Sequence, residues 1–156
     1  MNSLKPLTAK TGDSIFVVSY LKKYGYAPEY TIKEMSVAKR GRIYLTVMNP
    51  KYPCALERCK KYQIENGRER TEYGCGDTVT FDTAEDARSQ IMSDLLEELL
   101  RPFLTYNAWS ALNTLPPDAR PTALSTLYHT FNPTYPAPEP KITFIPAPEE
   151  PHHETD

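Results

Sequence analysis

The sequence has no long apolar run. Its longest apolar stretches, such as IFVV at 15–18, are far shorter than the roughly 20 residues that cross a bilayer as a helix. The opening MNSLKPLTAKTGD also lacks the apolar core of a signal peptide. We therefore expect a cytoplasmic protein that has no membrane partner.

Cysteine is scarce, with Cys54, Cys59 and Cys75 as the three in the chain. An odd count in a reducing compartment argues against a disulfide framework. The spacing C-x4-C followed by x15-C, without a nearby histidine, also differs from the paired short spacings of structural zinc sites. We expect small buried or half-buried thiols and no bound metal.

Residues suited to catalysis are few as well. Of three histidines, His129 falls in an expected helix, whereas His152 and His153 fall in a terminal tail, a poor place for preorganised chemistry. No G-x-S-x-G, H-E-x-x-H or phosphate-cradling motif is present. The sequence therefore predicts a protein that is not an enzyme, with no catalytic residue and no cofactor.

Proline is abundant and unevenly placed, since ten of the fifteen prolines follow residue 115. Such spacing favours extended backbone near the end of the chain. The length suits one domain with an appendage. We expect a single α+β domain at 11–131, β-rich at 11–82 and helical at 83–131, followed by an extended proline-rich tail at 132–156.

The first half carries short alternating segments typical of strands. They are expected at 15–20, 30–37 and 42–47, and the Asn66-Gly67 pair predicts a tight hairpin. In 30–37 the apolar phase changes after Ile32, which suggests a bulge. Several short strands joined by tight turns predict a small, strongly bent antiparallel sheet or an SH3-like barrel.

A packed amphipathic helix is expected at 83–101. Thr83 begins a capping-box-like pattern, apolar residues recur at three- and four-residue steps up to Leu100, and Pro102 ends the helix. The apolar stripe is expected to pack on the sheet, and a homodimer seam is the alternative. Two short helices should follow, the second with Asp118 as its cap and Pro121 in its first turn.

The charge of the chain is strongly divided. Residues 1–70 hold 14 Lys and Arg against 6 Asp and Glu, whereas residues 71–156 hold 4 against 14. The positive side chains gather near two expected turns, and we expect these turns to share one surface that contacts phosphate, with an aromatic ring nearby for base stacking. The candidate nucleic-acid contacts are Lys39, Arg40, Arg42, Tyr44, Lys60, Lys61, Arg68 and Arg70.

Tyrosine offers a different surface. Six of the eleven tyrosines precede residue 53, and tyrosine is enriched at protein interfaces. An apolar segment at 142–145 could also add to a sheet edge or to a partner. The candidate protein contacts are Tyr24, Tyr26, Tyr30, Ile142 and Phe144. Three functions therefore stay open: a nucleic-acid-associated module, a protein-binding inhibitor or adaptor, and a nucleotide-binding sponge.

The segments TGDSIFVVSY and YTIKEMSVAKRGRIYLTV, with the later FDTAEDARSQIM, resemble SH3-like or KOW-like barrels of small bacteriophage and mobile-element proteins. The likeness covers 12–48 and 79–100. It implies a non-enzymatic accessory protein that contacts nucleic acid or the transcription machinery, or that redirects a host protein in the bacterial cytoplasm. By position, the basic turn of Lys39, Arg40 and Arg42 would be the contact.

Overall fold

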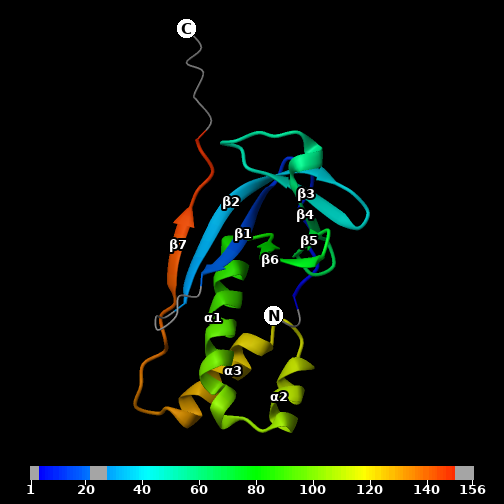
Figure 1. Cartoon of the computed structure of the whole chain (residues 1–156). Coiled ribbons are helices and arrows are strands. Elements are labelled where there is room, and N and C mark those ends of the chain that lie inside the picture. The colour runs from blue at the N-terminus through cyan, green and yellow to red at the C-terminus, as the bar shows by residue number, and fades with distance from the viewer. Residues whose placement is uncertain (1–3, 22–27, 150–156) are drawn as a thin grey trace.

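The computed structural model describes residues 4–21 and 28–149, and Figure 1 shows them as a β-barrel with a group of helices at one end. Tyr24 and Tyr26 lie outside the described residues. In the described part the strands are β1 (Ser14–Leu21), β2 (Glu29–Arg40), β3 (Tyr44–Met48), β4 (Lys60–Gln63), β5 (Arg68–Thr71), β6 (Gly74–Phe81) and β7 (Lys141–Ile145). The helices there are α1 (Ala84–Leu100), α2 (Tyr106–Asn113) and α3 (Arg120–Phe131), with 3-10 turns at Leu56–Arg58 and Arg101–Phe103.

Among the described strands, β1 to β6 close into an antiparallel barrel. They pair in the order β1-β6-β5-β4-β3-β2, and β1 also pairs with β2, which completes the ring. β2 is long enough for two partners, because its residues 29–36 pair with β1 and its last residues, 36–40, pair with β3. The closed barrel is compatible with an SH3-like barrel, and the expected α+β class is confirmed.

β1 is apolar on both faces because each face is buried in a different core. Ile15 and Val17 belong to the cluster inside the barrel, together with Tyr62. Val18 belongs to a second cluster, outside the barrel, where the strands pack against Ile91 of α1. The run IFVV is therefore the sequence of a strand placed between a barrel interior and a helix.

The same arrangement corrects the expected bulge in 30–37. The register of β2 with β1 is unbroken over 29–36, and the irregularity comes later, between Val37 and Lys39 in the pairing with β3. Tyr30 and Ile32 face the cluster shared with α1, whereas Val37 faces the barrel interior. The apolar phase of β2 thus changes because the strand buries its outer face under α1 near Tyr30 and Ile32, and its inner face in the barrel near Val37.

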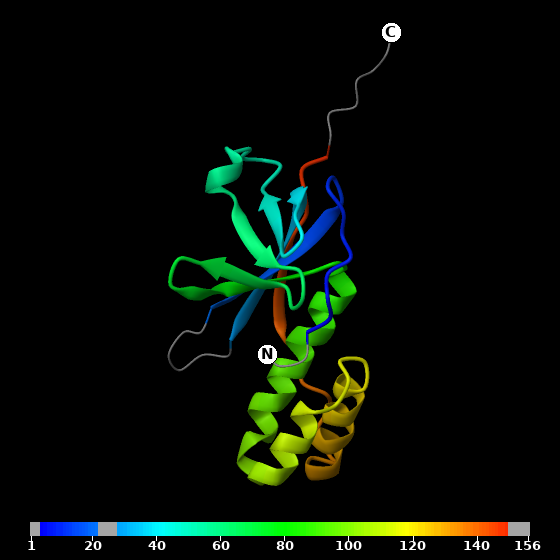
Figure 2. The same ribbon diagram turned by 90° about the vertical axis from the view of Figure 1, so that its right-hand side faces the viewer.

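α1 forms as the sequence predicts. The hydroxyl oxygen of Thr83 accepts a hydrogen bond of 3.0 Å from the backbone N–H of Asp86, which caps the helix. Figure 2 shows α1 running from the barrel to α2 and α3. Ile91 packs against the barrel, while Leu96 and Leu100 pack with the other helices. Ile91, Leu96 and Leu100 of the apolar stripe are thus buried by other parts of the same chain and not by a second copy of it.

The cap expected for the third helix is wrong. α3 begins after Ala119, with no side-chain cap bond, and Asp118 instead pairs with the ammonium of Lys5 at 2.5 Å. Pro121 does lie in the first turn, as predicted. The N-terminal segment therefore uses the carboxylate that the sequence pattern assigned to the helix.

A buried ion pair ties the three helices together. Arg120 is 3% exposed, and its guanidinium pairs with the carboxylate of Glu97 on α1. It also donates hydrogen bonds to the carbonyl of Leu112, at 3.1 Å, and to the side chain of Asn113, at 3.0 Å, both on α2. Burial lowers the pKa of Arg120 from its usual value.

The proline-rich segment includes the strand β7, which pairs in parallel with the first half of β2. Ile142 packs against the cluster beneath α1, and the ring of Phe144 stacks on that of Phe16 at a centroid distance of 6.3 Å. The apolar segment thus adds to a sheet edge of its own chain. None of the helices in the described part has the length and apolar character needed to cross a bilayer.

Candidate functional site

A row of side chains crosses the outer surface of the barrel from β2 to β5. Lys39 pairs with Thr46, Thr46 with Lys61, and Lys61 with Arg70. Directly paired residues in antiparallel strands point to the same face of the sheet. The three cations therefore lie on one face, although Lys61 and Arg70 are like charges placed opposite each other, an arrangement that costs stability.

Strand alternation in β3 and β4, and the irregularity between Val37 and Lys39 in β2, place this row outside. Leu45 and Tyr62, which neighbour Thr46 and Lys61 along the chain, are buried in the barrel interior. Lys39, Lys61 and Arg70 are exposed. The exposed face of these strands is therefore the one opposite Leu45 and Tyr62.

The β2–β3 turn adds a fourth cation. Gly41 donates its backbone N–H to the carbonyl of Tyr44 at 2.9 Å, closing the turn around exposed Arg42. Beside this turn lies an open hollow of about 330 Å³. It is lined by Lys39, Gly41, Arg42, Ile43, Tyr44, Thr46 and Lys61. Among the described residues no Asp or Glu lines it, so its charge is positive throughout.

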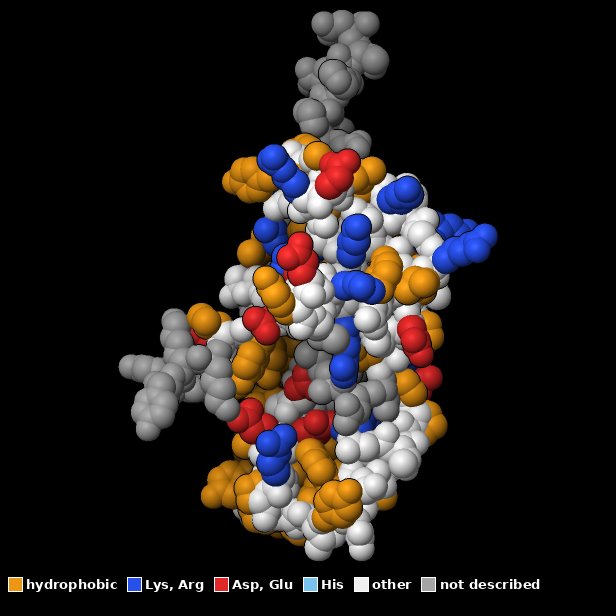
Figure 3. Space-filling view, turned by 45° about the vertical axis from the view of Figure 1, so that its right-hand side comes forward, with side chains coloured by type: hydrophobic (Ala, Val, Ile, Leu, Met, Phe, Trp, Pro, Cys, Tyr) orange, Lys and Arg blue, Asp and Glu red, His pale blue; other side chains and the backbone are white. Residues whose placement is uncertain are grey.

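We call Lys39, Arg42, Lys61 and Arg70 the cationic face. Figure 3 shows that Lys and Arg side chains gather over the barrel half of the visible surface, whereas the helical half shows few of them. In the described part of the chain, the members of the cationic face form no ion pair with a carboxylate. Their charge is therefore available to an anionic partner.

Tyr44 is held in place by one of these cations. The guanidinium of Arg70 lies 5.2 Å from the centre of the Tyr44 ring and donates a hydrogen bond to its hydroxyl. This combination of cation–π and hydrogen-bond contacts restrains both side chains. One face of the ring is occupied by Arg70, so a stacked base would have to use the other.

Three of the other expected contacts have partners of their own. Arg40, on the inner side of β2, donates to the carbonyls of Ala9 at 2.5 Å and Leu7 at 3.2 Å, which ties the N-terminal segment to the barrel. Lys60 pairs with the carboxylate of Glu69 at 2.8 Å. Arg68 is half-buried and also interacts within the protein. The expected basic residues therefore do not form one surface, because Arg40, Lys60 and Arg68 make contacts within the protein.

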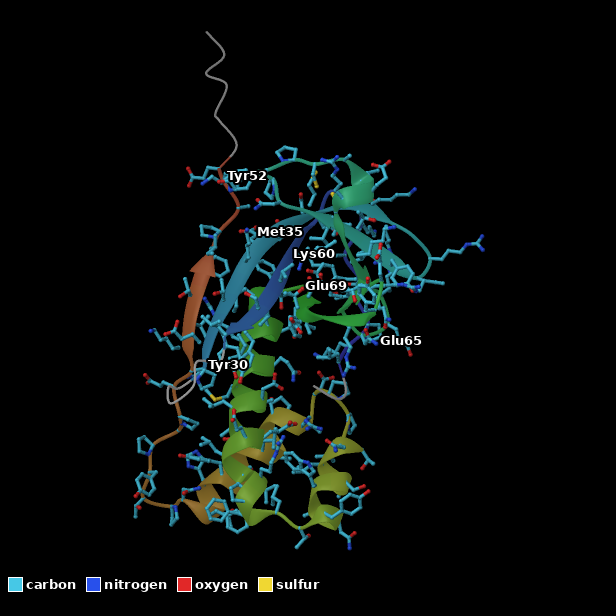
Figure 4. The ribbon with its side chains drawn as sticks, viewed as in Figure 1. Tyr30, Met35, Tyr52, Lys60, Glu65 and Glu69 are labelled. Carbon is cyan, nitrogen blue, oxygen red and sulfur yellow. The ribbon has the colours of Figure 1, made fainter. Side chains whose placement is uncertain are left out.

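Glu69 forms a buried polar network that the sequence analysis missed. Figure 4 shows Lys60 and Glu69 side by side at the barrel. The carboxylate accepts a hydrogen bond from the Thr78 hydroxyl, which contacts the Tyr62 hydroxyl at 2.9 Å. Burial alone would raise the pKa of Glu69, but the bonds from Lys60 and Thr78 outweigh it, so the pKa falls below its usual value.

A local signal for this network was present in the sequence. In the run Arg68-Glu69-Arg70, strand alternation places the glutamate on the face opposite its two arginine neighbours. Gly76 makes room for it, since a Cβ there would lie 2.6 Å from the Glu69 carboxylate. The network reaches Tyr62 in the barrel interior, so it serves the barrel rather than the cationic face.

The expected protein contacts are largely used within the fold. Tyr30 is 5% exposed and packs on Tyr20, with ring centres 5.3 Å apart. Burial, followed by the nearby charge of Asp94, raises the pKa of Tyr30 to about 12. Ile142 packs on the core, while Phe144 keeps 39% of its surface exposed. Tyr24 and Tyr26 fall outside the described residues.

No group of three or more His, Cys, Asp or Glu in the described part could hold a metal ion. Comparison of the chain with protein-family models, with curated proteins and with solved structures gave no match. The candidate site is therefore defined by geometry and charge.

Proposed function

We propose that this protein binds nucleic acid through its phosphate backbone, using the cationic face, and acts as a non-enzymatic regulatory or accessory module in the cytoplasm. The observation that carries the proposal is the ladder Lys39–Thr46–Lys61–Arg70, which places three cations on one face beside Arg42. Phosphate contacts supply most of the sequence-independent affinity for nucleic acid.

The composition of the face favours backbone contact over base readout. Its members are all Lys or Arg, and among the residues that line the hollow Tyr44, held by Arg70, is the aromatic one. A cationic groove with one stacking ring suits a single strand of any sequence. The likeness to phage and mobile-element proteins is one of pattern, and the proposal does not depend on it.

The hollow beside the turn supports a second candidate, a small phosphate ligand such as a nucleotide. It has a volume of about 330 Å³ and is lined by three cations, Lys39, Arg42 and Lys61. A nucleotide would use these same cations, so competition separates the two candidates. Excess nucleoside triphosphate should displace a labelled oligonucleotide weakly if the extended face binds the strand, and completely at low concentration if the hollow is a nucleotide site.

A charge-neutralisation experiment tests the main proposal. The variant Lys39→Gln/Arg42→Gln/Lys61→Gln removes three charges from the cationic face. The matched control Lys10→Gln/Lys51→Gln/Arg58→Gln removes three exposed charges from the same half of the chain, outside the hollow. Electrophoretic mobility of a labelled single strand at low salt should shift with the natural protein and the control, and remain unshifted with the face variant.

The same variants decide against the proposal if they behave alike. Equal retardation by the face variant and the control would mean that only net charge matters. The adaptor alternative is tested by affinity purification from bacterial lysate with and without nuclease. A protein partner that survives nuclease treatment and is retained by the face variant would favour an inhibitor or adaptor.

A further inference from the structure

Two cysteines lie together in the segment that leads from β3 into β4. The sulfur of Cys54 is 2.9 Å from that of Cys59, within about an ångström of the ~2.05 Å length of a disulfide bond. Cys54 is exposed and Cys59 is buried. We propose that this pair is a reversible disulfide site, with Cys54 as the attacking thiol and Cys59 as the resolving thiol. The site is separate from the cationic face and goes beyond the proposed function.

The backbone between the two cysteines holds them at this distance. Leu56–Arg58 forms one 3-10 turn, in which the N–H of Arg58 donates to the carbonyl of Ala55 at 2.9 Å. The N–H of Cys59 donates to the carbonyl of Leu56 at 3.3 Å. This turn reverses the chain, so that thiols five residues apart meet, and only a small side-chain movement is needed to join them.

The environments of the two thiols differ in a way that assigns their roles. Burial raises the pKa of Cys59 to about 11, with further contributions from the hydrogen bond and charge of Cys54. A buried thiol with a raised pKa is a slow nucleophile toward reagents in solution. Cys54 is accessible and can react first. Once Cys54 is in a mixed disulfide, Cys59 is already beside its sulfur.

The co-reactant is a low-molecular-weight disulfide, such as oxidised glutathione. The Cys54 thiol loses its proton to solvent, and the thiolate attacks one sulfur of the small disulfide, breaking its S–S bond and releasing one thiolate. The Cys59 thiol then loses its proton and attacks the Cys54 sulfur, releasing the second thiolate. The protein gives up two electrons and two protons, and the small disulfide becomes two thiols. Excess thiol reverses both steps.

The disulfide would close a short loop immediately before Lys60 and Lys61. Because the members of the cationic face lie on strands or in the β2–β3 turn and not in this loop, oxidation should fix the start of β4 and leave the cationic face in place. In a reducing compartment the same residues would remain free thiols. The sequence predicted buried or half-buried thiols, which holds for Cys59 and is wrong for the exposed Cys54.

Thiol trapping tests the site. The full-length protein is incubated with oxidised glutathione near pH 8, alkylated, digested and analysed by mass spectrometry. The expected result is a Cys54–Cys59 cross-link, with Cys75 alkylated, that reverts with reductant and also forms in a Cys75→Ser variant. Cys59→Ser should stop at glutathione on Cys54. In Cys54→Ser, modification of Cys59 should be about tenfold slower or more, because of its burial and pKa.

Other outcomes overturn the proposal. Alkylation of all three cysteines after oxidation would show that the pair does not close. A cross-link through Cys75 would place the disulfide elsewhere. Equal rates of modification in Cys54→Ser and Cys59→Ser would contradict the assigned roles. Circular dichroism of each variant establishes that it is folded before the reaction is measured.

Discussion

The substitution Glu97→Gln should destabilise the helical end, because it leaves the guanidinium of Arg120 without its paired carboxylate. Arg120 is 3% exposed, so it cannot recover this interaction from water. Removing one partner of a buried ion pair typically costs about 3–5 kcal/mol. The hydrogen bonds from Arg120 to Leu112 and Asn113 remain, and the carboxylate of Asp94 also acts on it. The loss should therefore fall near 3 kcal/mol.

For a chain of this length each kcal/mol lowers the melting temperature by about 2–4 °C, so a fall of about 6–12 °C is expected in thermal unfolding followed by circular dichroism. Glu85→Gln, in the exposed first turn of α1, is the control and should change stability by about 1 kcal/mol or less. The double variant Glu97→Leu/Arg120→Met removes both charges and should regain most of the lost stability. A fall for Glu97→Gln no larger than that of Glu85→Gln, or no recovery in the double variant, would refute the reasoning.

Two further predictions concern the Glu69 network. The pKa of Glu69 is lower in the folded protein than in the unfolded chain, so its stabilising effect is complete above the unfolded pKa of about 4.3 and is lost as pH falls through the folded pKa. Acid unfolding below about pH 4.5 should be less steep in Glu69→Gln, and parallel curves for the two proteins would contradict this. Gly76→Ala places a methyl group 2.6 Å from the Glu69 carboxylate and should cost about 1–3 kcal/mol in urea unfolding, whereas Gly12→Ala, with no atom within 4 Å of the added Cβ, should show only the cost of its positive φ.

The sequence predicts the fold where local signals agree with tertiary structure. The cap at Thr83 and the apolar spacing up to Leu100 predict α1 to within a residue. Asn66-Gly67 predicts the β4–β5 hairpin, in which Gly67 has a φ of 66°. These features succeed because hydrogen bonds and periodicity within a few residues determine them.

The failures have one physical origin, namely competition from residues distant in the sequence. Asp118 pairs with Lys5 across more than a hundred residues instead of capping its own helix. Tyr30 is of a residue type that is enriched at protein interfaces, but α1 covers it. The phase change in β2 reflects two separate cores, which no single-strand pattern can distinguish from a bulge.

The candidate site was predicted in part for a related reason. Strand alternation alone separates Lys39 from Arg40 and Lys60 from Lys61, because neighbouring residues in a strand face opposite sides. The sequence does not reveal which side faces the barrel interior until the partners are known. The ladder of paired strands supplies that information and keeps Lys39, Lys61 and Arg70 among the expected contacts, and Arg42 in the β2–β3 turn lines the same hollow.

The salt dependence of nucleic-acid binding tests the central claim most directly. If the four cations of the cationic face each neutralise one phosphate, log K against log salt should have a slope of about −3 for a single strand and about −4 for a duplex. Affinity should then fall about 50- to 150-fold between 50 and 200 mM salt. The variant Lys39→Gln/Arg42→Gln/Lys61→Gln should bring the slope near −1. A slope near zero for the natural protein, or an unchanged slope in this variant, would contradict the account.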